Sequence, residues 1–192
     1  MFEKSFSSKC RWIQVFSSIW RSKAWTITLV QSVLHLPDIR NMLQETVRVT
    51  KVFTIDMAHA LFGYDGPCKN IHGHTYHLHV TVAGKINNTP NVPEQGLVID
   101  FGVIKQITKD KVISKFDHAL VLHKDAPYSV DNFLPEHFEQ VILLPFQPSC
   151  ENLMLHFREL IAAELPSNVN LVKMRLEETP TSYAEWFLHD QR

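Results

Sequence analysis

Alternating apolar and polar positions in the first half of the chain predict a pair of long strands. Residues 46–59 alternate in this way, and every second residue at the end of the run would lie on one face: Phe53, Ile55, Met57 and His59. Residues 60–67 contain two glycines and a proline, which predicts a loop. Residues 71–83 are rich in β-branched and aromatic residues and predict a second strand. We therefore expect two strands joined by a loop that begins next to His59.

The middle of the chain changes from strand to helix patterning. Residues 84–96 are rich in asparagine and proline and predict a long connection, and the apolar run 97–101 predicts a short third strand. Residues 102–116 predict a helix because apolar residues recur there at nearly helical spacing, at Ile104, Ile107, Val112 and Phe116. Residues 123–148 are polar and contain prolines, so we expect a long insertion in which residues 141–144 add a strand.

The last third of the chain predicts a second helix followed by two strands. Ser149 is suited to cap the helix, Glu151 lies in its first turn, and Pro166 stops it. The apolar stripe of this helix comprises Leu153, Phe157, Leu160, Ile161 and Leu165. Strands are expected at residues 172–178 and 182–188, with Glu178 at the inward-facing end of the first. This order of elements is typical of an α+β fold, a sheet with helices on one face.

Composition limits the classes of function. The 192 residues suffice for one domain with a buried core, and 45% of them are hydrophobic. The formal charge of −1 gives no strong field for nucleic acid, and no apolar run is long enough to span a bilayer. The three cysteines, Cys10, Cys68 and Cys150, do not form a disulfide framework. We therefore expect a protein of the reducing cytoplasm with no nucleic-acid or membrane partner.

Residues 1–41 differ from the rest and form an atypical N-terminal extension. They contain three of the four tryptophans, many basic residues and few acidic ones. One interpretation is an organelle-targeting presequence, which would be basic and poor in acid. The other, which we favour, is a mis-assigned start, with Met42 as the natural first residue. In either case the folded domain is expected at residues 42–192.

Three histidines around the first loop form the strongest candidate site. His72 and His74 are two positions apart on a predicted strand, so they project from the same face. His59 has the right parity to meet them if the first two strands pair antiparallel. Neutral imidazole is the usual ligand of zinc, and three protein ligands with one open position are typical of a catalytic site. We expect Zn²⁺ to be bound by His59, His72 and His74.

Two further histidines, His77 and His79, repeat the His-x-His pattern on the same strand. Their parity is opposite to that of His72 and His74, so a single site cannot use both pairs without a bulge. We expect His77 and His79 to face solvent or a neighbouring subunit.

Other side chains with useful chemistry surround this cluster in the sequence. Cys68 lies in the polar loop that leads to His72, and its thiol is suited either to bind the metal or to remove a proton. Asp117 and His118 are a candidate proton relay, because a carboxylate fixes the tautomer and orientation of an imidazole. Glu178 would be costly at the mouth of a core face unless paired. Its two oxygens suit a planar heterocycle with adjacent N–H donors.

These motifs occur in an order that is similar to one known family. The matching residues are Phe53 to His59, Cys68, His72-Gly73-His74, Asp100-Phe101, Asp117-His118, Ser149-Cys150-Glu151-Asn152 and Glu178-Thr179. From about Val47 to the C-terminus the chain resembles the 6-pyruvoyltetrahydropterin synthase / 6-carboxytetrahydropterin synthase (QueD) family. Ser149-Cys150 stands where that family commonly has threonine-containing pairs, residues 123–148 are longer than in compact members, and residues 1–41 have no counterpart.

The resemblance implies a fold, an assembly and a role for each candidate residue. The fold would be the tunnelling fold (T-fold), a four-stranded antiparallel sheet with two helices packed on one face. Subunits would form an oligomeric barrel, a trimer or hexamer, with active sites between subunits. Zinc would be bound by His59, His72 and His74, the base would be Cys68, the relay would be Asp117 and His118, and the pterin would contact Glu178, Ser149 and Cys150.

The resemblance also implies a reaction. The family substrate is 7,8-dihydroneopterin triphosphate, which loses triphosphate after proton transfers on its side chain. Three residues separate Cys68 from His72, a short spacing that resembles the branch producing 6-carboxytetrahydropterin for queuosine and 7-deazapurine biosynthesis. A 6-pyruvoyltetrahydropterin synthase is the alternative. A generic zinc hydrolase and a non-catalytic pterin-binding protein remain further hypotheses.

Overall fold

The computed structural model describes residues 45–127 and 136–191. The predicted N-terminal extension at residues 1–41 and part of the predicted insertion at residues 123–148 lie outside the described residues. Within the described part of the chain, no helix is long and apolar enough to cross a membrane.

A long antiparallel hairpin forms the centre of the fold. Strand β1 (Thr46–His59) pairs with β2 (His72–Lys85) over its whole length, from Thr46 opposite Lys85 to His59 opposite His72. The loop between them contains one short 3-10 turn, η1 (Pro67–Lys69). Both strands were predicted from the alternation of apolar and polar residues, and the structure confirms them. This register places His59, at the end of β1, next to His72, at the start of β2.

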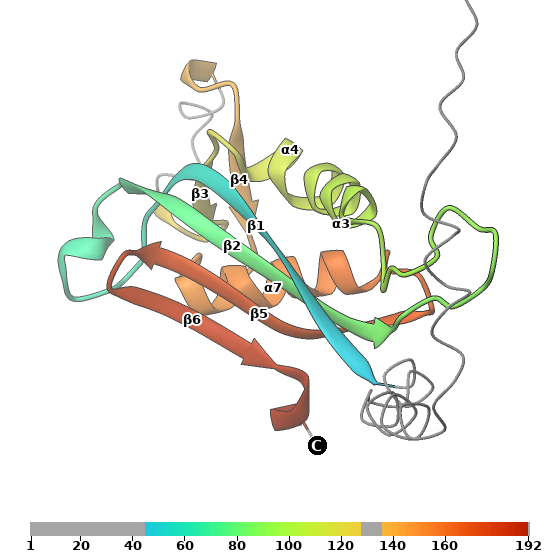
Figure 1. The fold of residues 1–192 in the computed structure, drawn as a ribbon. Helices are drawn as coiled ribbons and strands as arrows, with labels where there is room; N and C mark the ends of the chain where they lie inside the picture. The colour runs from blue at the N-terminus through green and yellow to red at the C-terminus, as the bar shows by residue number, and fades with distance from the viewer. Residues whose placement is uncertain (1–44, 128–135, 192) are drawn as a thin grey trace, which may run out of the picture. The chain divides into compact units, whose positions relative to one another are not determined.

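The sheet has six strands in the order β4-β3-β1-β2-β5-β6 (Figure 1). Strand β5 (Val169–Thr179) pairs antiparallel with β2 and with β6 (Ser182–Phe187), which is followed by the 3-10 turn η3 (Leu188–Gln191). These pairings confirm the predicted C-terminal strands.

The other edge of the sheet corrects the prediction of four antiparallel strands. Strand β3 (Leu120–His123) pairs parallel with β1, and β4 (Val141–Leu144) pairs parallel with β3. Strand β4 was expected as an addition from residues 141–144, but β3 was not. Four residues give too little alternation to distinguish a strand from a loop. The sheet is therefore mixed.

The predicted strand at residues 97–101 is also wrong. Phe101 begins helix α3 (Phe101–Thr108), and Asp100 is its N-cap, because the Asp100 carboxylate accepts a hydrogen bond from the backbone N–H of Gly102 at 2.6 Å. The preceding backbone turns back to Asn87, which donates to the carbonyl oxygen of Leu97 at 2.8 Å. The apolar pattern predicts a strand that includes Asp100, whereas Asp100 caps a helix.

The helices cover one face of the sheet (Figure 1). The first helical segment comprises α3, a π-helical turn η2 (Lys109–Ile113) and α4 (Ser114–Phe116), and the second is α7 (Cys150–Ala162). Ser149 caps α7 as predicted, its hydroxyl accepting from the backbone N–H of Asn152 at 3.4 Å. Both predicted stripes pack in one core, in which Ile107, Leu160 and Leu165 are partly buried. Its buried residues include Ile55, Leu78, Ile104, Phe116, Leu153, Phe157 and Leu176.

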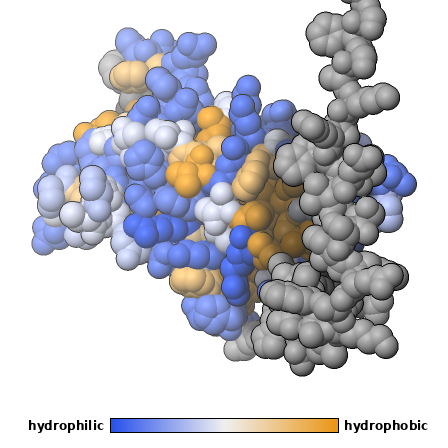
Figure 2. Space-filling model, viewed as in Figure 1, coloured by the Kyte–Doolittle hydropathy of each residue, from blue (hydrophilic) through white to orange (hydrophobic). Residues whose placement is uncertain are grey.

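The opposite face of the sheet bears polar side chains in cross-strand pairs. The hydroxyls of Thr50 and Thr81 lie 2.8 Å apart, and Nε2 of His79 in β2 lies 3.0 Å from the carboxylate of Glu177 in β5. Figure 2, viewed from the side away from α7, shows a largely hydrophilic surface with a hydrophobic area near its middle. The alternation along β1 and β2 thus separates an apolar face, where the helices pack, from a polar one.

Candidate metal centre

Three imidazoles converge at the end of the β1–β2 hairpin, on the face that carries the helices. His59 ends β1, His72 begins β2 directly opposite, and His74 follows two residues later on the same face. Their ligand atoms all lie within 4.8 Å of one another. The ring centroids are 4.5 Å apart for His59 and His72 and 5.0 Å apart for His72 and His74. The structure therefore brings together the three histidines that parity predicted.

Backbone carbonyls orient two of the three rings. Nδ1 of His59 lies 2.6 Å from the carbonyl oxygen of Pro148, and Nδ1 of His72 lies 2.8 Å from that of Asn70. Because a carbonyl oxygen only accepts, each Nδ1 carries the proton, and each Nε2 keeps its lone pair. This arrangement is typical of metal-binding histidines, whose second ring nitrogen is held by a carbonyl or carboxylate.

The third ring has an unpaired polar atom. Nε2 of His74 is buried and has no hydrogen-bond partner. A buried polar atom without a partner costs free energy unless something else satisfies it. A metal ion held by His59, His72 and His74 would satisfy it, so the side chains present fit a metal ion.

Burial also keeps His59 in the form that binds metals. His59 is 2% exposed, and desolvation lowers its pKa, assisted by the nearby imidazoles of His72 and His74. The hydrogen bond to Pro148 and the carboxylate of Glu178 oppose this shift. The net effect favours neutral imidazole at neutral pH.

His77 and His79 lie on the other face of β2, as their parity predicted. Nδ1 of His77 is 3.4 Å from the hydroxyl of Thr54, and Nε2 of His79 is 3.0 Å from the carboxylate of Glu177. Glu177 is half-buried and bridges His79 and Arg175. Neither histidine is part of the three-imidazole cluster.

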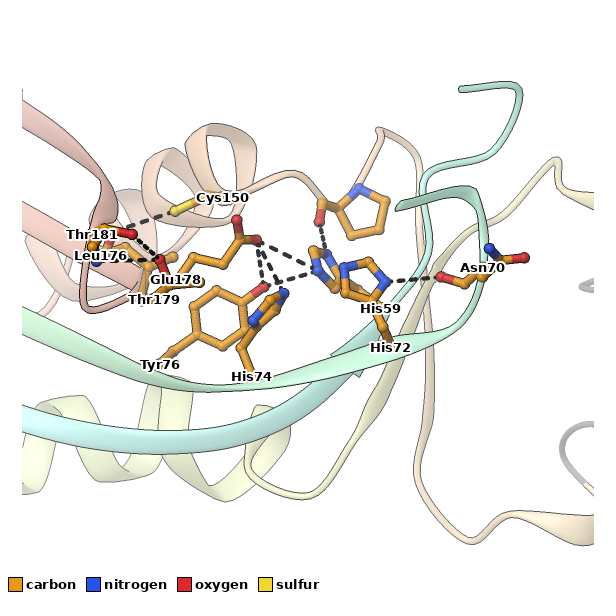
Figure 3. Close-up of polar contacts among 11 residues, drawn as sticks. His59, Asn70, His72, His74, Tyr76, Cys150, Leu176, Glu178, Thr179 and Thr181 are labelled. Atoms are coloured by element: carbon orange, nitrogen blue, oxygen red, sulfur yellow. Dashed lines mark hydrogen bonds and ion pairs between the residues drawn. The ribbon is translucent and has the colours of Figure 1, made fainter. Parts of the chain in front are cut away.

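The Glu178 carboxylate points into the imidazole cluster from β5 (Figure 3). Its Oε1 accepts a hydrogen bond from the Tyr76 hydroxyl at 3.1 Å and lies 3.5 Å from Nε2 of His59 and 3.8 Å from Nε2 of His74. Glu178 is 25% exposed, so it remains accessible from outside. The structure thus places the predicted ring-binding carboxylate beside the candidate metal ligands.

Tyr76 belongs to the site, although the sequence analysis did not select it. Its side chain is fully buried, and its hydroxyl lies 3.2 Å from Nε2 of His59 as well as against Glu178. Burial raises the pKa of Tyr76 above its ordinary value, and the Glu178 carboxylate adds to the shift. Tyr76 therefore remains a neutral hydrogen-bond donor. Its parity, shared with His72 and His74, was the signal that could have identified it.

Cys68 lies in the η1 turn, within the loop that joins the first two ligands. It is half-buried and not in a disulfide, and its carbonyl oxygen accepts from the backbone N–H of Leu61 at 2.8 Å. The loop therefore holds a thiol near the cluster.

Asp117 and His118 lie apart from the imidazoles, at the other side of β1. The Asp117 carboxylate accepts from the backbone N–H of Asp56 at 3.0 Å, and its second oxygen is 3.2 Å from Nδ1 of His118. Asp56 is three residues before His59, so its side chain points to the opposite face and accepts from Thr75 at 2.6 Å. His118 lines an open cleft of about 570 Å³ on this side, together with Asp56, Gly73, His74, Thr75, Leu120 and Phe138.

The backbone at His118 is strained. Its φ is 63°, in the left-handed region that non-glycine residues rarely adopt, and its N–H donates to the carbonyl oxygen of Asp56 at 2.5 Å. The side chain is nevertheless 76% exposed. A strained residue that presents an exposed imidazole is a reason to suspect a functional role.

Ser149 and Cys150 use their side chains within the protein. The Ser149 hydroxyl caps α7, and the Cys150 thiol donates to the carbonyl oxygen of Leu176 at 3.3 Å. Burial raises the pKa of Cys150 to about 12, so it remains a thiol at neutral pH. Cys150 contacts β5 two residues before Glu178, and the side chains of both Ser149 and Cys150 are already hydrogen-bonded within the protein.

Known proteins resemble this chain over most of its described part. The sequence profile of the family described as 6-pyruvoyl tetrahydropterin synthase matches residues 48–187. A Rickettsia bellii protein named 6-carboxy-5,6,7,8-tetrahydropterin synthase is 31% identical over 141 residues, covering 72% of this chain and 99% of that protein. A Pyrococcus horikoshii protein named putative 6-carboxy-5,6,7,8-tetrahydropterin synthase is 31% identical over 158 residues, covering 77% of this chain and 92% of that protein.

A solved structure resembles the fold. Plasmodium falciparum 6-pyruvoyl tetrahydropterin synthase superposes with a TM-score of 0.56 at 21% sequence identity, covering 76% of this chain and all of that one. Together these matches confirm the family expected from the sequence motifs and the α+β T-fold class.

Proposed function

Because the chain belongs to the 6-pyruvoyl tetrahydropterin synthase family, we propose that it is a 6-carboxy-5,6,7,8-tetrahydropterin synthase acting on 7,8-dihydroneopterin triphosphate, with release of triphosphate and of a two-carbon fragment of the side chain. The similarity to relatives named for the carboxy product supports this choice. The short spacing from Cys68 to His72 supports it as well. The observation that carries the proposal is the cluster of His59, His72 and His74 with Glu178 beside it.

We propose Zn²⁺ as the metal held by His59, His72 and His74. When bound, zinc would supply Lewis acidity that makes protons on the substrate side chain more acidic. The protein's own contribution is to present three neutral imidazoles, two of which the carbonyls of Asn70 and Pro148 hold in place.

Glu178 would hold the pterin ring. Two parallel hydrogen bonds from adjacent ring N–H groups to one carboxylate fix both the position and the plane of the ring. In the ring-free structure the Tyr76 hydroxyl donates to one oxygen of this carboxylate. Ser149 and Cys150 would border the ring mainly through backbone atoms, since their side chains are already hydrogen-bonded within the protein.

Cys68 would act as the base that removes a proton from the substrate side chain. A thiol in the loop between two metal ligands is close to whatever binds beside them. The η1 turn shapes the loop between Cys68 and His72. The Asn70 side chain closes this turn by donating to the carbonyl oxygen of Pro67 at 3.1 Å.

The relay of Asp117 and His118 would act on a neighbouring subunit. Within one chain this pair bonds to the backbone of Asp56 at the edge of β1 that faces β3. His118 lines a cleft with Asp56 and Thr75, whose side chains lie on the face opposite the imidazole cluster. A second copy of the chain that offered its own His118 would complete the site. We therefore propose a homo-oligomer, a trimer or hexamer, with active sites between subunits.

A second candidate product is 6-pyruvoyltetrahydropterin, because the matching family is named for that activity. A non-catalytic pterin-binding protein or a generic zinc hydrolase would not require Cys68, Asp117 and His118 together with Glu178. We further propose that the carboxy product enters queuosine or 7-deazapurine biosynthesis in the cytoplasm. The free thiols of Cys68 and Cys150 are compatible with a reducing compartment.

The direct test is to incubate the reduced, zinc-loaded protein with 7,8-dihydroneopterin triphosphate. We expect triphosphate release and a product with the mass of 6-carboxytetrahydropterin. The mass of 6-pyruvoyltetrahydropterin would instead assign the second candidate. The Cys68→Ala variant should retain zinc and lose turnover. The proposal would be refuted if the wild-type protein bound zinc and consumed no substrate.

A further inference from the structure

We propose that the Glu178 carboxylate has two alternating positions: in the substrate-free protein it occupies the fourth position around the metal, and it leaves that position when the pterin ring binds. This inference rests on the proposed function, because it uses the same metal and the same ring-binding carboxylate. It adds a ligand to the three histidines and a means by which ring recognition opens the site.

The distances between Glu178 and the imidazoles carry the argument. Ligands around tetrahedral zinc lie about 2.0–2.1 Å from the ion, so two of them are about 3.4 Å apart. Oε1 of Glu178 is 3.5 Å from Nε2 of His59 and 3.8 Å from Nε2 of His74. These two separations are close to the spacing expected between ligands of one ion, and a rotation of the side chain would bring the carboxylate to the metal.

The surroundings of Glu178 favour this inward position. Figure 3 shows the carboxylate directed at His59 and His74, with the Tyr76 ring between β2 and the carboxylate. The Tyr76 hydroxyl donates to the same Oε1 and cannot follow it outward, because the side chain is fully buried. Metal-binding carboxylates commonly receive such a hydrogen bond from an outer-shell residue, which fixes their orientation.

Ring binding and metal binding compete for the same carboxylate. Two parallel N–H bonds from a heterocycle require both oxygens of Glu178, so Oε1 cannot stay directed at the metal. Glu178 is partly exposed and has a flexible side chain, so it can turn toward an incoming ring. Recognition of the ring thereby vacates the metal position that the substrate's side-chain hydroxyls need. Without substrate, the carboxylate closes that position to other molecules.

The test uses Co²⁺ in place of zinc, because the visible absorption of Co²⁺ reports its ligands and needs no turnover. The probe is pterin without a side chain, which has the ring that Glu178 would bind and no hydroxyls to reach the metal. We expect pterin to change the cobalt spectrum of the wild-type protein. The Glu178→Gln variant should show an altered spectrum before pterin is added, no further change with pterin, and a cobalt dissociation constant raised about tenfold or more.

Two variants serve as controls. Glu177→Gln removes the adjacent carboxylate, which points to the opposite face and contacts His79 and Arg175, and its spectrum should match that of the wild type. Tyr76→Phe removes only the hydroxyl that holds Oε1, and it should weaken cobalt binding in the same direction as Glu178→Gln, by a smaller factor.

The outcomes separate this inference from the proposed function. A Glu178→Gln protein with the wild-type cobalt spectrum and affinity would overturn the inference and leave the synthase proposal standing, provided that the wild type turns over substrate. A wild-type protein that binds no stoichiometric Co²⁺ or Zn²⁺ would overturn both.

Discussion

The carbonyl oxygen of Pro148 accepts a hydrogen bond from Nδ1 of His59 at 2.6 Å, across 89 positions of sequence. The bond connects the end of the central hairpin to the segment that precedes helix α7. The neighbouring residue, Gln147, contacts the hairpin loop through Phe62, so this short segment orients both a candidate metal ligand and the loop that carries Cys68. The geometry of the site therefore depends on a segment that contributes no metal ligand itself.

The first prediction concerns metal stoichiometry. His74→Ala should abolish stoichiometric zinc binding, because two imidazoles leave the metal without a third protein ligand. His77→Ala is the matched control on the same strand, since His77 lies on the opposite face and should leave zinc binding unchanged. Zinc content after dialysis, measured by mass spectrometry of the metal, distinguishes the two. Equal zinc loss in both variants would contradict the parity argument.

The second prediction concerns the pH dependence of stability without metal. Burial lowers the pKa of folded His59 below its ordinary value of 6.5, so the unfolded chain binds a proton at a higher pH than the folded chain. The stabilisation is therefore complete above pH 6.5 and is lost as pH falls from 6.5 toward the lower folded pKa, by at most about 1.4 kcal/mol per pH unit for one proton. Burial lowers the pKa of His156 as well, which adds a contribution of the same sign.

Urea unfolding in EDTA at several pH values between 7.5 and 5 measures this loss. The His59→Gln variant should lose less free energy of unfolding over that interval than the wild type. A variant that carries both His59→Gln and His156→Gln should lose less still. A wild-type stability that rose as the pH fell below 6.5 would refute the assignment.

Strand parity accounts for most of what the sequence could predict about the site. It selected His59, His72 and His74 over His77 and His79 because a side-chain period of two leaves no freedom in a regular strand. It also placed Glu178 inward. The same rule would have selected Tyr76, but an aromatic residue at an inward position looks like ordinary core, and only the structure shows its hydroxyl against Glu178.

Sequence patterns could not predict the relationships that depend on distant segments. Strand β3 is too short for alternation, and its parallel pairing with β1 arises from the path of the chain after His118. Asp117 and His118 were predicted as a candidate relay, and adjacency alone does not establish a contact; the structure shows their contact with each other and their attachment to Asp56, which has no local signal. Their position opposite the imidazoles therefore became visible only in three dimensions.

The third prediction concerns the Gln147 side chain, which clamps the loop before Cys68. Its amide oxygen accepts from the backbone N–H of Phe62 at 3.0 Å, its amide nitrogen donates to the Phe62 carbonyl oxygen, and Asn152 holds the Gln147 carbonyl at 3.0 Å. Gln147→Ala should lower turnover by loosening the position of Cys68, while zinc binding through His59 persists. Each hydrogen bond contributes about 1 kcal/mol, so the variant should lose about 1–2 kcal/mol of stability.

Steady-state kinetics and zinc analysis of Gln147→Ala test this role. Gln140→Ala is a control, because that side chain makes a comparable amide–carbonyl bond to Lys115, away from the Cys68 loop. Loss of zinc from the Gln147 variant, or equal loss of turnover in both variants, would show that the clamp has no specific effect on Cys68.

The fourth prediction tests whether one site uses residues of two chains. Asp117 and His118 bond to the backbone of Asp56 in β1, and His118 opens to the cleft on the face opposite the imidazole cluster, so each active site should combine Cys68 of one subunit with His118 of another. Cys68→Ala and His118→Ala homo-oligomers should each be inactive while retaining zinc. Oligomers assembled from an equal mixture of the two should regain part of the wild-type activity, because some interfaces then contain an intact Cys68 and an intact His118.

The mixture is formed by co-expression with two different affinity tags and isolated by sequential purification, and its activity is compared with that of co-expressed wild-type chains. The double variant Cys68→Ala/His118→Ala, co-expressed with wild-type chains, measures how much activity the intact subunits retain in mixed oligomers. If mixed Cys68→Ala and His118→Ala oligomers stay as inactive as their parents, both residues act within a single chain, and the shared-site arrangement is wrong.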